Sequence, residues 1–187
     1  MKKRDFYNYD NEKFKFLREP MRNVMKAYGE AERYFAFIKE ITWAEFGLKS
    51  TTDYIHSLEH IQPEYVDEFK EIMAQLGLMV EYPSIDELAE PLEDLDKVFE
   101  VCVGIIDETD RALCEFVKTV DVSIMEGATV NAFSLARQVE TLIIKNSEDR
   151  EFLLEAWSMW DNNPSYTSFD NWVEHHAPNL KNEGEDD

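Results

Sequence analysis

Glycine and proline are scarce in this sequence, with 6 of each among its 187 residues. A β-sandwich or β-barrel needs a turn after about every 8–12 residues, so this scarcity argues against both folds. No run approaches the roughly 18 consecutive apolar residues of a membrane-spanning helix. No apolar segment follows the basic residues 2–4, as a secretory signal would require. We therefore expect a cytoplasmic protein without a membrane partner.

Cysteine is also rare, and its two copies, Cys102 and Cys114, fall within an apolar pattern of helical spacing. Twelve residues along one helix correspond to about 18 Å, which is too far for a disulfide bond. We expect both side chains to be buried apolar groups of a protein that stays reduced.

Basic residues are outnumbered, with 19 lysines and arginines against 40 acidic residues and a formal net charge of −21. Such a surface repels the phosphate backbone, so direct nucleic-acid binding is not expected. The charge favours cations or a basic protein partner. It is also explained by solubility alone, and both interpretations stay open.

Hydrophobic residues make up 44% of the chain, which is enough for a folded core. They recur at three- and four-residue steps, as on one face of an α-helix. The pattern predicts a first helix over about 20–46 and a second over about 51–77. Pro63 interrupts the second helix and predicts either a kink or two helices that meet near Gln62.

Two capping boxes predict the next helix starts. Ser84 and Glu87 form one ahead of a long third helix, and Ser123 and Glu126 form another ahead of the fourth. In a capping box the serine and the acidic side chain each satisfy a free backbone donor of the first helical turn. The sequence therefore predicts four helices of bundle length.

Ser147 is the expected cap of a short fifth helix that ends near Trp160, and one further turn is expected around Phe169 and Trp172. Together these elements predict an all-α fold, an antiparallel four-helix bundle with a short additional C-terminal helix. The expected organisation is an N-terminal arm over 1–19, the bundle domain over 20–162 and a polar acidic tail over 163–187.

The segment Tyr65–Gly77, with the sequence YVDEFKEIMAQLG, resembles the end of the second helix in the Dps family, the mini-ferritins. In that family an Asp-x-x-x-Glu pair precedes a helix end rich in Leu, Ala, Ile and Gly, and a loop with proline follows. Here Ser84–Leu88 stands where the next helix of the family begins. The resemblance covers about residues 23–145 and implies a ferritin-like bundle.

The resemblance also implies an iron site between subunits, with two histidines and an aspartate from one subunit and the Asp-x-x-x-Glu pair from the other. Asp67 and Glu71 match the pair in type and spacing. His56 stands at the aspartate, while Glu40 and Thr52 stand at the two histidines. Imidazole and carboxylate suit iron and a threonine does not. The implied ligands are therefore Glu40, His56, Asp67 and Glu71.

Other registers stay open, because a local gap near the proline moves His60 or Glu45 into the pattern. His56 and His60 share a helix face and can bind a metal, although surface histidines are the simpler interpretation. The other branch of the superfamily uses Glu-x-x-His motifs inside the bundle, and none occurs here. Asp53-x-x-His56 is the one near match. His175 and His176 are expected to be exposed.

The resemblance implies a cytoplasmic oligomer, the dodecamer of the family, that stores iron as Fe2+ and Fe3+ and protects against oxidative stress. A ferroxidase activity would follow from it, with peroxide or oxygen as the oxidant. The alternative is a ferritin-like helical bundle without a working metal site, which acts as an acidic binding or assembly protein for a basic partner. An unrelated acidic helical regulator is the third hypothesis.

Overall fold

The computed structural model describes residues 16–75, 92–125, 131–162 and 164–178, and the single positions 78, 80, 83 and 84. Within these residues the chain forms four long helices, a short π-helical turn and one short C-terminal helix. Their bounds are α1 Arg18–Ile41, η2 Thr42–Phe46, α2 Lys49–Gln75, α3 Leu95–Met125, α4 Asn131–Asn162 and α5 Tyr166–His176. The predicted all-α bundle is confirmed. In the described part of the chain, none of the helices has the length and apolar character needed to cross a membrane.

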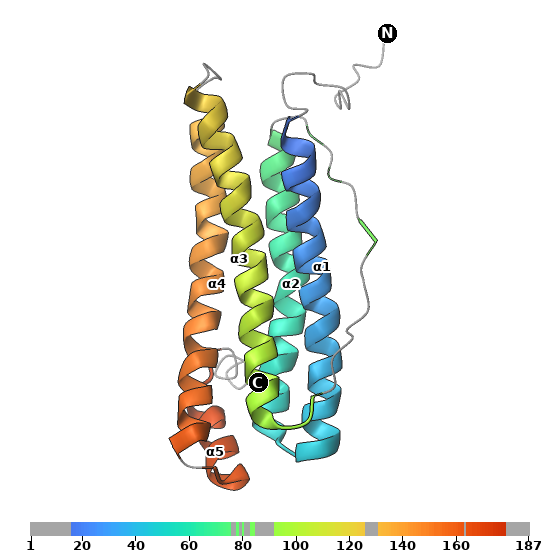
Figure 1. The fold of residues 1–187 in the computed structure, drawn as a ribbon, viewed down its shortest axis with the longest axis vertical. Coiled ribbons are helices and arrows are strands. Elements are labelled where there is room, and N and C mark those ends of the chain that lie inside the picture. The colour runs from blue at the N-terminus through green and yellow to red at the C-terminus, as the bar shows by residue number, and fades with distance from the viewer. Residues whose placement is uncertain are drawn as a thin grey trace, which may run out of the picture.

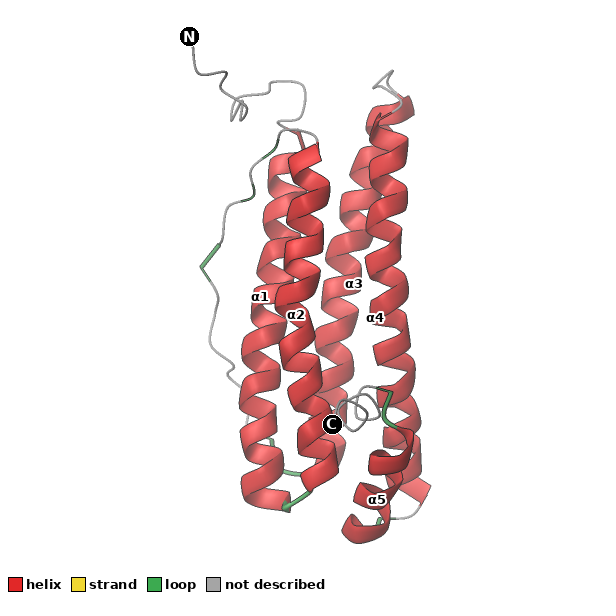
Figure 2. Ribbon diagram, turned by 180° about the vertical axis from the view of Figure 1, so that it is seen from behind, coloured by secondary structure: helices red, strands yellow, loops and turns green. Residues whose placement is uncertain are grey.

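The four long helices lie side by side (Figure 1). α1 and α2 form one antiparallel pair, and α3 and α4 form the other. α2 stops at one end of the bundle and α3 begins at the opposite end, so these two run in the same direction on a diagonal. Each long helix is therefore antiparallel to the neighbours that it contacts. α5 folds back at the end of the bundle where α4 stops (Figure 2).

The hydrophobic core consists of two clusters with a layer of polar side chains between them. One cluster joins the beginnings of α1 and α4 to the ends of α2 and α3. The other joins the opposite ends of these helices to Phe169 and Val173 of α5. The fully buried members of the polar layer are Gln62 of α2, Thr109 of α3, and Asn146 and Asp149 of α4.

α3 begins later than its sequence signal predicts. It starts at Leu95, where the Asp94 carboxylate accepts a 2.8 Å hydrogen bond from the backbone N–H of Lys97. Residues 92–94 are not helical, so the predicted long helix that runs on from Ser84 is wrong. Glu87 lies outside the described residues. The N-cap of α3 is an aspartate, which satisfies a free backbone donor without the second half of a box.

Ser123 and Ser147 do not begin helices either. Ser123 lies inside α3, and its predicted partner Glu126 lies outside the described residues. Ser147 lies in the middle of α4, where its hydroxyl donates a 2.8 Å hydrogen bond to the carbonyl of Ile143. A serine bonded to its own helix continues it instead of capping a new one. The predicted fifth helix is therefore the second half of α4.

Pro63 lies inside α2, which continues through it as one helix. Of the two alternatives predicted for Pro63, this excludes two helices that meet near Gln62. Proline removes one backbone donor of the helix. One residue earlier, the Gln62 side-chain amide donates a 2.9 Å hydrogen bond to the carbonyl of Leu58. This side-chain bond is added to the same turn in which the proline lacks a backbone donor.

The turn expected around Phe169 and Trp172 is an eleven-residue helix, α5. Phe169 is buried, and Trp172 stacks on Phe152 of α4 with ring centroids 5.7 Å apart. These apolar contacts hold the helix on the bundle. The division of the chain into arm, bundle domain and tail stays a prediction.

Candidate metal centre

The outward side of α2 carries a row of exposed side chains, His56, His60, Pro63, Asp67 and Glu71. They recur at three- and four-residue steps, which keeps them on one side of the helix. The row, which we name the α2 stripe, faces away from the core. It contains three of the four ligands that the sequence predicts.

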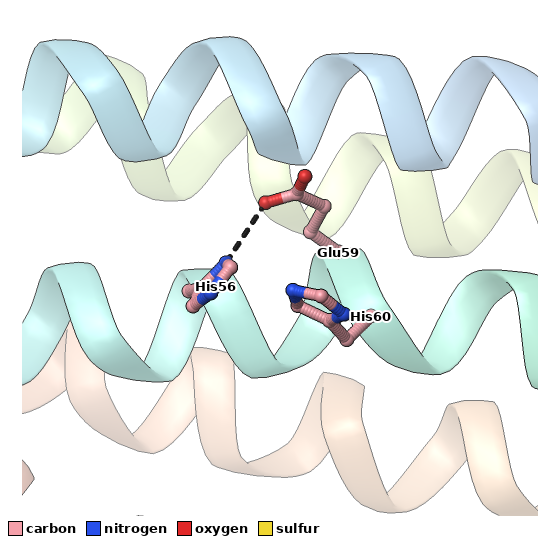
Figure 3. Close-up of side chains that lie close together, drawn as sticks. All are labelled: His56, Glu59 and His60. Carbon is pink, nitrogen blue, oxygen red and sulfur yellow. Dashed lines mark hydrogen bonds and ion pairs between the residues drawn. The ribbon is translucent and has the colours of Figure 1, made fainter.

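At one end of the α2 stripe, His56 and His60 lie next to Glu59 (Figure 3). These three potential metal ligands are named here the His–Glu cluster. Each offers one ligand atom, and these atoms lie within 4.8 Å of one another. His56 Nδ1 is 3.0 Å from Glu59 Oε2, and the two imidazole rings meet edge to face with centroids 4.3 Å apart. In the described part of the chain this is the one group of three such residues so close together.

α1 adds a positive charge to the cluster. Lys39 Nζ lies 2.6 Å from Glu59 Oε2 and 3.3 Å from His56 Nδ1. Partial burial of Glu59 acts to raise its pKa, but hydrogen bonds from Lys39 and His56 outweigh burial and lower the pKa of this carboxyl. Glu59 is therefore an anion at neutral pH, held in place by the groups around it.

Two imidazole nitrogens and a carboxylate oxygen are the ligand set of many transition-metal sites, including zinc and ferrous iron sites with open positions. All three groups here come from neighbouring turns of one helix, so their backbone positions are fixed before a metal binds. His56 and His60 are exposed and Glu59 is partly buried, which leaves the cluster open to solvent and to exchangeable ligands. The arrangement suits reversible binding of a divalent cation.

Of the four predicted ligands, His56 alone belongs to the cluster. Glu40 is exposed on α1, next to Lys39 in sequence. Asp67 is exposed and pairs with Lys70 at 2.6 Å. Asp67 and Glu71 lie about 16 and 22 Å beyond His56 along the helix axis, so within one chain they cannot share a metal with it. This separation agrees with their predicted place on a second subunit, which stays a prediction.

Glu59 is absent from the predicted ligand set, and His60 enters it only in the alternative register with a local gap near the proline. The signal for them is spacing, because residues three and four positions after His56 share its helix face. His56 and His60 were left open as metal ligands or as surface residues, and both side chains are exposed. The sequence does not single out Glu59 as a ligand, because it is one of 40 acidic residues. Glu59 contacts Lys39, which lies 20 residues earlier in the chain, and only the structure reveals this contact.

The polar layer inside the bundle offers a different set of groups. The Asn146 amide donates hydrogen bonds to Asp110 Oδ1 at 2.9 Å and to Thr109 Oγ1 at 3.1 Å. The Tyr65 hydroxyl donates to Asp149 Oδ2 at 3.4 Å. Burial raises the pKa of Asp149 to about 6, against the lowering effect of that hydrogen bond. The layer thus joins α2, α3 and α4 through hydrogen bonds.

A solved structure matches this arrangement over nearly its whole length. The crystal structure of M. penetrans ferritin aligns with a TM-score of 0.69 and 13% sequence identity, over 90% of this chain and 97% of that chain. This chain has the ferritin fold. Comparison of the sequence with known protein families and with curated proteins gives no match. The likeness to the ferritin shows the fold alone, and function rests on the residues.

Ferritin-like bundles commonly hold iron between the long helices, on carboxylates and Glu-x-x-His motifs. The polar layer of this chain also lies between the long helices, and its residues do not fit such a centre. Among the described residues all four histidines are exposed. The layer offers one buried carboxyl, Asp149, and one half-buried carboxyl, Asp110. The Asn146 amide and the Thr109 hydroxyl are poor iron ligands.

Proposed function

We propose that this protein binds iron at the His–Glu cluster and acts as a Dps-like iron-storage protein that protects against peroxide. The observation that supports this proposal is the convergence of His56, Glu59 and His60, whose ligand atoms lie within 4.8 Å of one another. The net charge of −21 raises the concentration of cations around the protein. Fe2+ is therefore drawn to a surface that carries preformed nitrogen and oxygen ligands.

The α2 stripe supports a site shared between two subunits. His56 and Asp67 lie at nearly equal distances on either side of residue 62, on the same face of α2. Antiparallel pairing of two α2 stripes about that point brings the His–Glu cluster of one subunit next to the Asp67 and Glu71 carboxylates of the partner subunit. Glu40 of α1 is exposed beside Lys39 and adds a further carboxylate. Fe2+ held there gives one electron per ion to peroxide or oxygen.

The second candidate is a ferritin-like bundle without a working metal site, which binds a basic partner through its acidic surface. The polar layer favours this candidate, because hydrogen-bonded amide and hydroxyl groups stand in the interior where ligands would be needed. Metal binding at the His–Glu cluster separates the two candidates.

The test is an anaerobic titration of the whole protein with Fe(II), followed by calorimetry. Replacing His56 and His60 with alanine should weaken binding by about 100-fold or more, because even residues that only orient metal ligands change affinity by about 10- to 100-fold. The matched control replaces His175 and His176, two exposed histidines on α5, and should bind as the unmodified protein does.

Equal affinities of the two double variants would show that iron binds elsewhere. Absence of Fe(II) binding by the unmodified protein would overturn the proposal and favour the acidic binding protein.

A further inference from the structure

Lys39 is the one cationic group seated in the His–Glu cluster among the described residues. It reaches the cluster from α1, while all three potential ligands lie on α2. Its side chain is 24% exposed and that of Glu59 is 21% exposed, so their contact is shielded from solvent more than the surrounding surface pairs are. Lys49 and Asp53, for comparison, are 74% and 43% exposed.

The ammonium group of Lys39 contacts two of the atoms that a metal ion at the cluster would bind. Lys39 Nζ, His56 Nδ1 and Glu59 Oε2 form a triangle with sides of 2.6, 3.0 and 3.3 Å. A metal ion that binds His56 Nδ1 and Glu59 Oε2 lies about 2.0–2.2 Å from each. It would then share the oxygen and the nitrogen that the ammonium group now contacts. Two cations this close repel each other, so one of them has to leave.

We infer that Lys39 is a built-in competitor that lowers the affinity of the His–Glu cluster for divalent metals. This inference rests on the proposed function and concerns the same cluster. A metal must displace the ammonium group to bind, so the measured affinity is the intrinsic affinity reduced by the fraction of molecules in which Lys39 has moved away.

The two imidazole ligands select among the cations that can displace Lys39. Transition-metal ions bind imidazole strongly enough to displace an ammonium group, whereas Mg2+ and Ca2+ prefer oxygen ligands and gain little from the two histidines. Lysine suits the role because its ammonium is a compact charge on a flexible four-carbon stem that can move to solvent. A partly exposed ion pair adds little to stability, so removal of Lys39 should leave the bundle folded.

The experiment compares Co(II) binding by the unmodified protein, Lys39→Leu and Lys49→Leu, with calorimetry and the visible spectrum of bound Co(II) as readouts. Leucine removes the ammonium group and supplies no ligand atom. We expect Lys39→Leu to bind Co(II) about 10-fold more tightly. Lys49→Leu removes the same charge from an ion pair with Asp53 outside the cluster, and its affinity should stay unchanged. Lys39→Gln is the second variant, and circular dichroism checks the fold of each.

The outcomes separate this inference from the proposed function. If the unmodified protein binds Co(II) and the two Lys39 variants bind it equally or more weakly, Lys39 is not a competitor and the metal site stands. If the Lys39 variants bind and the unmodified protein does not, competition is supported and the metal-binding function is overturned. If none of them binds, the His–Glu cluster is not a metal site and both proposals fail.

Discussion

Asp149 is a carboxyl group held almost entirely inside the bundle, with 6% of its surface exposed. Among the described residues, its one hydrogen bond to a side chain is the 3.4 Å contact with the Tyr65 hydroxyl. Burial favours the neutral acid, which is why the pKa of Asp149 rises to about 6. In the unfolded chain the pKa returns to about 3.9.

The raised pKa makes stability depend on pH. Below about pH 3 both the folded and the unfolded chain carry a neutral Asp149, so the group adds no penalty. Between about pH 4 and 6 the unfolded chain ionises first, and the folded state loses about 3 kcal/mol of its free energy of unfolding from this group. Above pH 6 the loss is complete.

Replacing Asp149 with Asn should therefore raise stability at pH 7.5 relative to the unmodified protein, and the gain should vanish near pH 4. The measurement is urea unfolding followed by circular dichroism at both pH values. Glu140→Gln, which alters an exposed carboxylate on the same helix, is the control and should show no such pH-dependent difference. A gain of equal size at both pH values would show that Asp149 does not titrate as its burial demands.

At the scale of the elements, α5 does more than cover the end of the core. Asp170 of α5 accepts hydrogen bonds from the backbone N–H groups of Ser50 and Thr51 at 3.1 and 2.9 Å, and from the Thr51 hydroxyl at 2.9 Å. The two backbone N–H groups lie in the first turn of α2, where the helix itself offers no carbonyl to accept their hydrogen bonds. A residue about 120 positions later thus caps the helix that carries the His–Glu cluster.

We expect Asp170→Ala to lower the free energy of unfolding by about 1–2 kcal/mol, as the loss of a helix cap does. Asp170→Asn, which keeps one acceptor oxygen, should lose less. Thermal unfolding measures both variants, with Glu174→Ala on the exposed side of α5 as the control. If Asp170→Ala unfolds at the same temperature as that control, the contact between α5 and α2 contributes nothing to stability.

At the scale of the whole molecule, the proposal of a Dps-like assembly predicts a large closed oligomer. Twelve chains of 22.0 kDa give a mass of about 264 kDa, and native mass spectrometry measures it. A monomer or dimer at this protein's working concentration would contradict the dodecamer, and with it a storage cavity.

The interface site makes a separate prediction for the assembled protein. Asp67→Ala together with Glu71→Ala should reduce the rate of Fe(II) oxidation by about 10-fold or more, since each site loses two carboxylates from the neighbouring subunit. The matched control is Glu151→Ala with Glu155→Ala, an exposed pair with the same four-residue spacing on α4. Absorbance of the Fe(III) product gives the rate. If both double variants oxidise iron at the unmodified rate, the interface site has been assigned to the wrong carboxylates.

Local pattern alone predicted the class of the fold and the inward face of each long helix. The buried positions Val24, Tyr28 and Phe35 of α1 recur in the steps that predicted that helix. Of the two cysteines expected to be buried on α3, Cys102 is buried and Cys114 is only partly buried. The same local signals placed helix boundaries poorly. Ser123 and Ser147 resemble caps, but whether a serine caps a helix depends on whether the backbone before it stays helical, which packing decides.

The sequence by itself determined an acidic helical bundle, its stripe of exposed histidines and carboxylates on one helix, and the absence of Glu-x-x-His, because all of these are matters of composition and spacing along one element. Tertiary structure alone decided that Lys39 sits against Glu59, that Asp170 caps α2, and that Asn146 and Asp149 lie in one polar layer with Thr109. Each of these contacts joins different helices. Periodicity fixes the direction in which a side chain points from its own helix, whereas the neighbour it meets depends on how the helices pack and on the path of the chain between them.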